Sequence, residues 1–263
     1  MAWLASAPVK SMALIEHSAV QVGLAGIVGD RRYALIDPQD RLVSGKRIGP
    51  LATIVPGVRE DPEALALHFP DGSVIEEDVL RGRAVSAVFY GEGRPAHEVR
   101  GSFSRTLSEW AGQPIRLIRL DDDGGGIDRS DEGGGFSLVS SGSLLSLAQA
   151  AGLADPLDPR RFRMSSVVEG VEPYAEDGWL GRLVQLGEVV VRVRGNIGRC
   201  AVTTHDPATG RRSLDTLKLL AETRGDLPST EPLPFGVFAT VLVPGEIRLG
   251  DPVTVLDESP VSS

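Results

Sequence analysis

Glycine and proline divide this sequence into short segments, and their spacing limits the folds that the chain can adopt. The 263 residues include 31 Gly and 18 Pro, whereas aromatic residues make up only 5%. In the first third, runs with strand-like alternation cover 18–22, 32–36, 65–69, 73–79 and 84–90, with turn residues between them. Strands this short, joined by hairpin-sized gaps, predict a small β-barrel or a strongly bent sheet.

A few short helices are expected among the strands. Residues 104–111 have apolar side chains at helical spacing, with Ser104 as the predicted N-cap and Gly112 as the stop. Further helices are predicted over 143–151 and over 214–221. We therefore predict a fold that is mainly β with a few short helices (α+β).

Later segments add strands and two stretches without regular structure. Strands are expected at 114–120, from Arg161 onward, at 183–186 and 189–193 as a hairpin, and in the tail from 235 to 253. The acidic, glycine-rich stretch 121–135 is interpreted as a mobile loop and a candidate lid. Phosphate-binding glycine loops lie at helix N-termini and lack such carboxylates, so phosphate binding there is disfavoured. Residues 258–263 are predicted to be disordered.

Composition narrows the class of protein. One cysteine excludes an intramolecular disulfide, and the apolar run at the N-terminus is too short for a signal sequence or a membrane span. We therefore expect a soluble, cytoplasmic protein that does not bind membranes. The formal net charge of −9 argues against non-specific nucleic-acid binding. A local basic pocket remains compatible with that charge.

Several polar elements could serve an anionic ligand, although each is also typical of a solvated surface. If a strand begins at Arg161, then Arg161, Arg163 and Ser165 share one face, and their apolar neighbours share the other. Buried arginines need anionic partners. Ser140 and Ser141 precede the helix predicted over 143–151, where hydroxyl and backbone N–H groups are available to an anion.

The single cysteine, Cys200, follows Arg199 and a glycine-broken lead-in over 196–198. A lone cysteine is usually a small buried hydrophobe, which is the simpler interpretation. A bulge in the lead-in would let Arg199 and Cys200 face one ligand, and a nearby guanidinium favours the thiolate. His205 would lie on the opposite face of a regular strand, which disfavours a Cys–His pair. One thiolate with several arginines suits an anionic cofactor that supplies most ligands of its own metal.

The stretch Gly198-Arg199-Cys200-Ala201-Val202-Thr203-Thr204-His205-Asp206-Pro207-Ala208-Thr209-Gly210 resembles the signature of the MOSC domain, the molybdenum cofactor sulfurase C-terminal family. The resemblance is to the branch that contains the mitochondrial amidoxime-reducing component and its bacterial relatives. It extends along most of the chain, in order, through Pro8-Val9-Lys10-Ser11, Gly23-Leu24, Asp30-Arg31, Arg161-Phe162-Arg163, the segment 174–179, the segment 214–218, Phe235-Gly236 and the segment 250–253.

The resemblance implies a β-barrel-like N-terminal domain (1–95) packed on a MOSC β-barrel (96–257), with a molybdenum cofactor (molybdopterin) at the interface. It implies that Cys200 is the protein ligand to molybdenum, and a soft sulfur donor suits this metal. The positions that match those holding the pterin and its phosphate are Lys10, Ser11, Arg31, Arg163 and Arg199. Ser140 and Ser141 are added by position only, and Glu176-Asp177 is either a turn or a support for a neighbouring arginine.

One departure from the branch concerns cofactor or substrate contacts. Met164-Ser165 stands where these relatives usually have Pro-Asn, so Ser165 offers a short hydroxyl in place of an amide. The sequence also contains neither a membrane anchor at its N-terminus nor a four-cysteine ferredoxin domain at its C-terminus. We therefore expect electrons to come from a separate electron-transfer protein.

Three functions follow from the resemblance. The first is a molybdenum-dependent oxidoreductase that removes oxygen from small N-hydroxylated or N-oxide-type substrates. The second is sulfur transfer by a persulfide on Cys200, with a pyridoxal phosphate-dependent cysteine desulfurase as the partner. The third is a non-enzymatic carrier of the molybdenum cofactor.

Overall fold

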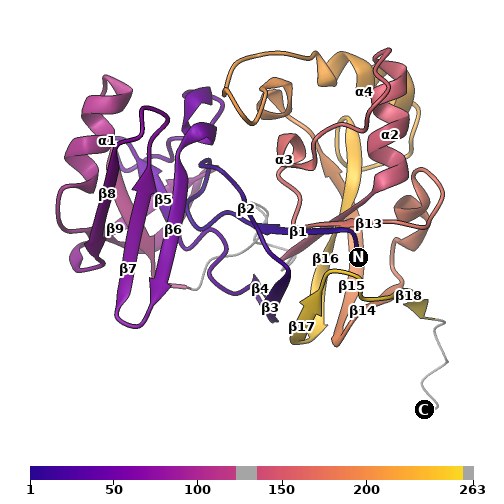
Figure 1. The fold of residues 1–263 in the computed structure, drawn as a ribbon, viewed down its shortest axis with the longest axis horizontal. Coiled ribbons are helices and arrows are strands. Elements are labelled where there is room, and N and C mark those ends of the chain that lie inside the picture. The colour runs from indigo at the N-terminus through magenta and orange to yellow at the C-terminus, as the bar shows by residue number, and fades with distance from the viewer. Residues whose placement is uncertain (123–134, 257–263) are drawn as a thin grey trace.

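The computed structural model describes residues 1–122 and 135–256, and Figure 1 shows them as two packed parts. The predicted lid, 121–135, lies outside the described residues except for 121–122 and 135, and the predicted disordered tail, 258–263, lies wholly outside them. Within the described ranges, no helix is both long and apolar enough to cross a bilayer.

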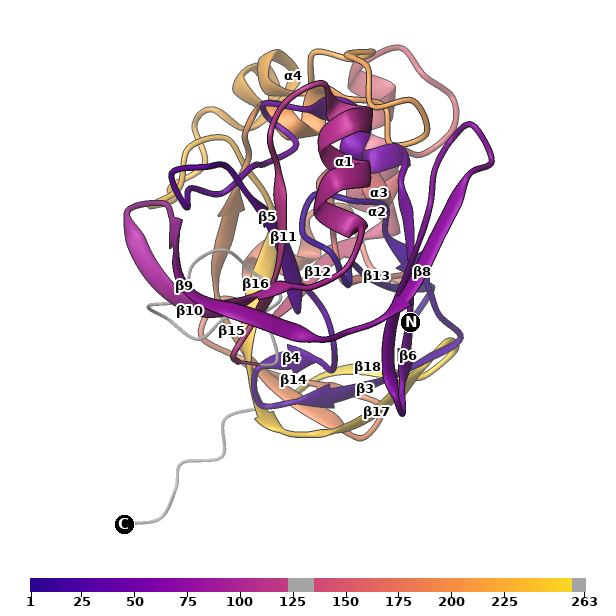
Figure 2. The same ribbon diagram turned by 90° about the vertical axis from the view of Figure 1, so that its left-hand side faces the viewer.

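The first part, drawn in indigo to magenta, contains two antiparallel sheets and a helix. One sheet has the order β5-β11-β10-β9, and the other has the order β6-β7-β8. The elements are β5 (Tyr33–Ile36), η1 (Gly49–Thr53), β6 (Val55–Glu60), β7 (Glu63–His68), β8 (Val74–Asp78), β9 (Arg81–Phe89), β10 (Glu92–Val99), α1 (Phe103–Ala111) and β11 (Arg116–Leu120). Figure 2 shows how strongly β9 and β10 curve around this part.

The second part is built on an eight-stranded sheet of order β18-β14-β15-β16-β12-β13-β1-β2 and a small sheet β17-β3-β4. Its N-terminal strands are β1 (Trp3–Ser6), β2 (Ile15–Glu16), β3 (Ala19–Gly23) and β4 (Gly26–Ile27). The other strands are β12 (Phe136–Ser140), β13 (Ser166–Val168), β14 (Leu183–Leu186), β15 (Val189–Gly198), β16 (Pro234–Val243), β17 (Gly245–Arg248) and β18 (Val253–Leu256). The helical elements are α2 (Ser141–Ala150), α3 (Pro159–Phe162), η3 (Ala175–Trp179), η4 (Ala201–Thr204) and α4 (Thr216–Arg224).

The predicted α+β class is confirmed, because strands dominate and the helices are short. The described sheets are open, however, and do not form the predicted β-barrels. None of the described sheets closes, since each has two strands that pair on one side only. The domain division predicted at residues 95 and 96 stays a prediction. In the structure these residues lie within β10, which pairs with β9 and β11, and β1 pairs with β13 of the second part.

Local sequence explains the helix ends. Gly112 adopts φ 65° after α1, as its lack of a side chain allows, and its N–H donates to the carbonyls of Ser108 and Glu109. Ser104 is not the N-cap, because α1 already begins at Phe103, and the Ser104 hydroxyl accepts from Leu117 N at 3.1 Å instead. At the start of α2, the Ser140 hydroxyl accepts from Ser143 N at 3.0 Å.

The strand predicted from Arg161 onward is wrong. Residues 159–162 form the short helix α3, with Asp158 as the N-cap and Pro159 in its first turn. Arg163 then adopts the left-handed conformation, and β13 begins only at Ser166. Because helix and turn replace the strand, the predicted common face of Arg161, Arg163 and Ser165 does not exist.

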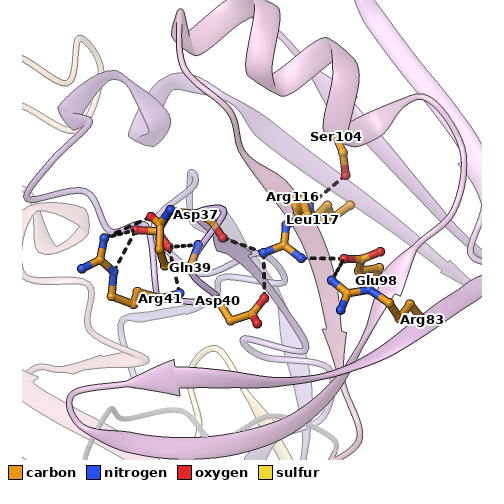
Figure 3. A network of polar contacts seen from close by, with 9 residues as sticks. All are labelled: Asp37, Gln39, Asp40, Arg41, Arg83, Glu98, Ser104, Arg116 and Leu117. Atoms are coloured by element: carbon orange, nitrogen blue, oxygen red, sulfur yellow. Dashed lines mark hydrogen bonds and ion pairs between the residues drawn. The ribbon is translucent and has the colours of Figure 1, made fainter.

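Polar contacts fix the turn after β5 (Figure 3). Arg116 of β11 donates to the Asp37 carbonyl and to Asp40, each at 2.7 Å, and to Glu98 of β10 at 2.6 Å. Asp37 itself is 4% exposed and accepts from Arg41 and from Gln39. This network holds the edge of the four-stranded sheet against the segment 40–47, which leads to the cavity described next.

Candidate cofactor-binding cavity

A cavity of about 540 Å³ lies where the two parts meet. This volume is in the range of sites that enclose small organic ligands. The Lys and Arg residues that line it come from both parts of the molecule and are Lys10, Arg31, Lys46, Arg160, Arg161, Arg163 and Arg199. Among the described residues of its wall, Asp206 is the only acidic one. A local basic pocket, with which the net charge of −9 is compatible, is therefore present.

Cys200 lines this cavity directly after β15. The strand pairing shifts register between Asn196 and Gly198, so the bulge expected in the lead-in is confirmed. The residues after Cys200 form the 3₁₀ turn η4 and not the expected β run, and Cys200 is its N-cap residue. The Cys200 carbonyl accepts from both Thr203 N and Thr203 Oγ1 at 3.0 Å, which fixes the backbone beside the thiol. Cys200 is partly exposed.

Arg199 also borders the cavity, but its guanidinium is directed into the protein. It donates to the Phe235 carbonyl at 2.8 Å, to the Phe162 carbonyl at 2.9 Å and to the Met164 sulfur at 2.9 Å. Burial lowers the pKa of Arg199 to about 9, and the neighbouring Cys200 opposes this shift. The structure thus brings Arg199 and Cys200 to one cavity, with Arg199 anchoring the segment that carries the thiol.

The remaining cations predicted to hold the cofactor meet at the junction of the two parts. Arg31 forms an ion pair with Asp30 and donates to the Arg163 carbonyl at 3.3 Å. Arg163 donates back across the junction to the Met12 carbonyl at 2.8 Å. The Lys10 ammonium lies 5.8 Å from the centre of the Tyr90 ring. These contacts place the predicted cations on both sides of one cavity.

Three of the predicted cofactor residues adopt a backbone conformation that L-amino acids rarely use. The φ angles of Ser11, Arg31 and Arg163 are 75°, 54° and 53°. Each non-glycine residue in this region costs on the order of 1 kcal/mol or more, and such residues cluster at ligand sites. The three line the same cavity. The strain therefore coincides with the residues that the sequence resemblance singled out.

Three other predicted residues do not line the cavity. Ser140 is fully buried as the cap of α2, and Ser141 is the first residue of that helix. Ser165 is 2% exposed, and its backbone N–H donates to Ser137 Oγ at 2.8 Å. Ser137 itself does line the cavity. Ser165 therefore borders the site through Ser137.

Glu176 and Asp177, the two acidic residues of η3, have different surroundings. Asp177 accepts from Arg224 at 2.6 Å and from Asn196 Nδ2 at 2.7 Å, so it does orient an arginine. Arg224 in turn lies 4.2 Å from the centre of the Tyr174 ring. Glu176 is fully buried and accepts from the Ser143 hydroxyl at 2.7 Å. Asp177 thereby ties α4 to the bulge of β15 that precedes Cys200.

Two cavity residues were missed by the sequence analysis as parts of this site. For His205, the sequence only disfavours a Cys–His pair on a regular strand, but the 3₁₀ turn η4 brings both residues to the cavity. Arg161 was placed on a strand face, whereas it donates from α3 to the carbonyls of Thr203 and His205 at 3.2 and 2.9 Å. Asp158 followed by Pro159, an N-cap signal, could have indicated this helix.

The residues present fit an anionic organic cofactor that carries its own metal ligands. Among residues 1–122 and 135–256, no group of three or more His, Cys, Asp or Glu is arranged to hold a metal ion. A metal bound by Cys200 would therefore take its other ligands from the bound group. The cations of the wall suit a phosphate, since guanidinium and ammonium groups bind phosphate oxygens strongly.

Fold and site thus define a β-rich protein with one thiol in a basic cavity between two parts. A MOSC domain model matches residues 132–254. Mitochondrial amidoxime reducing component 2 of Rattus norvegicus is 35% identical, over 93% of this chain and 78% of that protein. The human mitochondrial amidoxime-reducing component 1 is 26% identical, over 95% and 81%. The chain belongs to the MOSC domain family.

A further relative is a longer protein. The molybdenum cofactor sulfurase of Drosophila grimshawi is 29% identical over 96% of this chain. The chain spans about a third of that relative, 34% of its length.

Proposed function

We propose that this protein is a molybdenum-cofactor-dependent oxidoreductase that removes oxygen from small N-hydroxylated or N-oxide-type substrates. The observation that carries the proposal is the lone thiol of Cys200 in a cavity lined by cations from both parts of the molecule. The names of two relatives, which describe amidoxime reduction, support the reaction class.

Each group in the cavity has a role in this proposal. Cys200 would be the protein ligand to molybdenum, as a thiolate is a strong donor for a soft metal. Lys10, Arg31 and Arg163 would hold the phosphate and pterin. The bound cofactor would supply two-electron redox chemistry, and a separate electron-transfer protein would supply the electrons. We also propose that the protein acts in the cytoplasm.

The test is metal and pterin analysis of anaerobically purified protein from a host that makes the molybdenum cofactor. We expect molybdenum and pterin in the wild-type protein, and loss of molybdenum in Cys200→Ala. Lys218→Gln, on the exposed side of α4, is a control that leaves the cavity unchanged. Wild-type protein without molybdenum, or Cys200→Ala with a full complement of it, would contradict the proposal.

A second candidate function is sulfur transfer, and the relative named molybdenum cofactor sulfurase favours it. Cys200 would then carry a persulfide delivered by a pyridoxal phosphate-dependent cysteine desulfurase. Mass spectrometry of the protein after incubation with such an enzyme and cysteine would reveal one added sulfur on Cys200. An unmodified thiol under these conditions would eliminate this function. A cofactor carrier, the third function considered, would load molybdenum and pterin but reduce no substrate.

A further inference from the structure

His205 is a cavity residue that the proposed function has not yet used. It follows η4, the turn that begins beside Cys200, and it lines the same cavity. Its ring packs against Gly49, where an added Cβ would lie 3.3 Å from both Cε1 and Nδ1. The missing side chain at Gly49 therefore leaves room for the imidazole at this point of the wall.

The nitrogens of the His205 ring are available to a ligand. Across the described residues, neither nitrogen makes a hydrogen bond. Neither nitrogen is fully buried, either. By contrast, His17 bonds to the Ser6 hydroxyl at 2.9 Å, and His97 bonds to Asp121 at 2.7 Å. The backbone of His205 is fixed, since its carbonyl accepts from Arg161 at 2.9 Å and its N–H donates to Val202.

The surroundings of His205 make its charge responsive to an anion. Burial lowers its pKa, and the nearby cations Arg212 and Arg161 lower it further. The adjacent carboxylate of Asp206 caps its own turn by accepting from the N–H groups of Ala208 and Thr209. Lys46 is a further cation of the same cavity wall. A bound anionic cofactor favours the protonated imidazole, because it offsets these cations.

We propose that His205 is a catalytic residue, the proton donor to the oxygen that leaves the substrate nitrogen. This inference depends on the proposed function. In the overall step, R–NHOH takes up two electrons and two protons to give R–NH₂ and water. The N–O bond breaks, an N–H bond forms, and a one-electron carrier protein supplies the electrons in succession. His205 gives one proton to the leaving oxygen, solvent gives the other to nitrogen, and solvent then reprotonates the imidazole.

The other acids of the wall suit this step less well. Lysine and arginine are weak acids near neutral pH, because their ordinary pKa values lie well above it, and even the lowered pKa of Arg199 stays near 9. Cys200 is assigned to the metal in the proposed function. Histidine is the side chain whose ordinary pKa of about 6.5 matches proton transfer near neutrality.

The experiment compares wild-type protein with His205→Gln, both loaded with cofactor, and uses His68→Gln as the control because His68 is exposed on β7. Molybdenum and pterin contents are expected to be equal in all three. With an amidoxime as substrate, we expect His205→Gln to lower kcat about 100-fold, as for loss of a general acid, with little change in KM. In wild-type protein, kcat should fall about tenfold per pH unit above the imidazole pKa. This dependence should be absent in His205→Gln.

A second readout does not depend on turnover. The His205 ring resonance, assigned by its loss in His205→Gln, should titrate at a higher pH in loaded than in cofactor-free protein. An unchanged kcat and pH profile in loaded His205→Gln, or a ring titration indifferent to loading, would overturn the inference while leaving the proposed function intact. Loaded wild-type protein that reduces no N-hydroxylated or N-oxide compound would instead refute the proposed function, and the inference with it.

Discussion

Arg161 and Arg199 show how single residues prepare this cavity. The guanidinium of Arg199 binds two backbone carbonyls and a sulfur, and that of Arg161 binds two carbonyls and the Ser213 hydroxyl. Burial lowers the pKa of both side chains. Neutral acceptors compensate a buried positive charge only in part, so each of these cations stabilises an anion in the cavity.

The buried carboxylate of Asp37 is expected to stabilise the fold. Burial raises its pKa, but the N–H groups of Arg41 and Gln39 and the charge of Arg41 outweigh that effect, so the pKa is lowered. Asp37→Asn would turn an amide N–H₂ toward arginine donors. We expect a loss of about 2 kcal/mol in the free energy of unfolding at pH 7, measured with urea. Asp78→Asn, in an exposed ion pair, should cost less than about 1 kcal/mol.

The pH dependence of this effect has a defined sign. A carboxyl group whose pKa is lowered on folding contributes stability that is present above its unfolded pKa of about 3.9 and is lost as the pH falls through its folded pKa. The difference between wild type and Asp37→Asn should therefore be full at pH 7 and shrink below about pH 4. A difference that stays constant down to pH 2.5 would mean that the charge of Asp37 is not the cause.

At the scale of elements, the site depends on short turns that sequence patterns describe poorly. Alternating runs closed by turn residues predicted β3, β5, β7, β8 and β9 well, because hairpin register is a local property. The two segments nearest the thiol, α3 and η4, were both predicted as strands. Each is about one turn long, so apolar spacing cannot distinguish it from a strand, and tertiary contacts decide its conformation.

The site residues likewise include some that the sequence predicted correctly and some that it did not. Lys10, Ser11, Arg31, Arg163, Arg199 and Cys200 do line one cavity, as the family resemblance implied. Their meeting could not be derived from spacing, since Lys10 and Cys200 lie 190 positions apart in the sequence and belong to different strand connections. Ser140 and Ser141 were inferred from the start of a helix alone, and the cap of α2 uses that start internally.

Gly210 closes the turn that follows η4 and provides a prediction at this scale. It has φ 66°, and an added Cβ would lie 2.5 Å from Gly49 O and from Pro50 Cα. Gly210→Ala should therefore lower the free energy of unfolding by the left-handed cost of about 1 kcal/mol plus a backbone clash. Gly152→Ala is the matched control, because Gly152 has φ 74° and nothing within 4 Å of the added atom.

The measurement is urea unfolding of both variants, with molybdenum content as a second readout. Gly210→Ala should be the less stable variant and should lose metal, because the displaced turn follows the segment that carries the thiol. Equal losses of stability in the two variants would show that the close approach between Gly210 and Gly49 has no energetic weight.

At the scale of the whole molecule, an acidic protein encloses a basic cavity. The net charge of −9 and the cations around Cys200 predict that anions bind locally while the surface repels them. Inorganic phosphate should stabilise cofactor-free protein, by about 2.7 kcal/mol at 100 times its Kd. Each kcal/mol should raise Tm by about 2–4 °C for a chain of this size.

Calorimetry with increasing phosphate, against chloride at equal ionic strength, checks this expectation. Lys10→Gln should weaken the phosphate effect, whereas Lys218→Gln, on the exposed side of α4, should not. Equal stabilisation by chloride, or an undiminished phosphate effect in Lys10→Gln, would contradict a phosphate site in the cavity.

The pairing of β1 with β13 has a consequence for the order of events during synthesis. Strands β5 to β11 find their partners within residues 33–120, but β1 needs residues 166–167 and β3 needs β17 at 245–248. The first strands to leave the ribosome therefore wait for some of the last, while the intervening sheets can form from local contacts. The cavity joins residues of both groups. The described wall of the cavity is complete only after translation has passed Phe238.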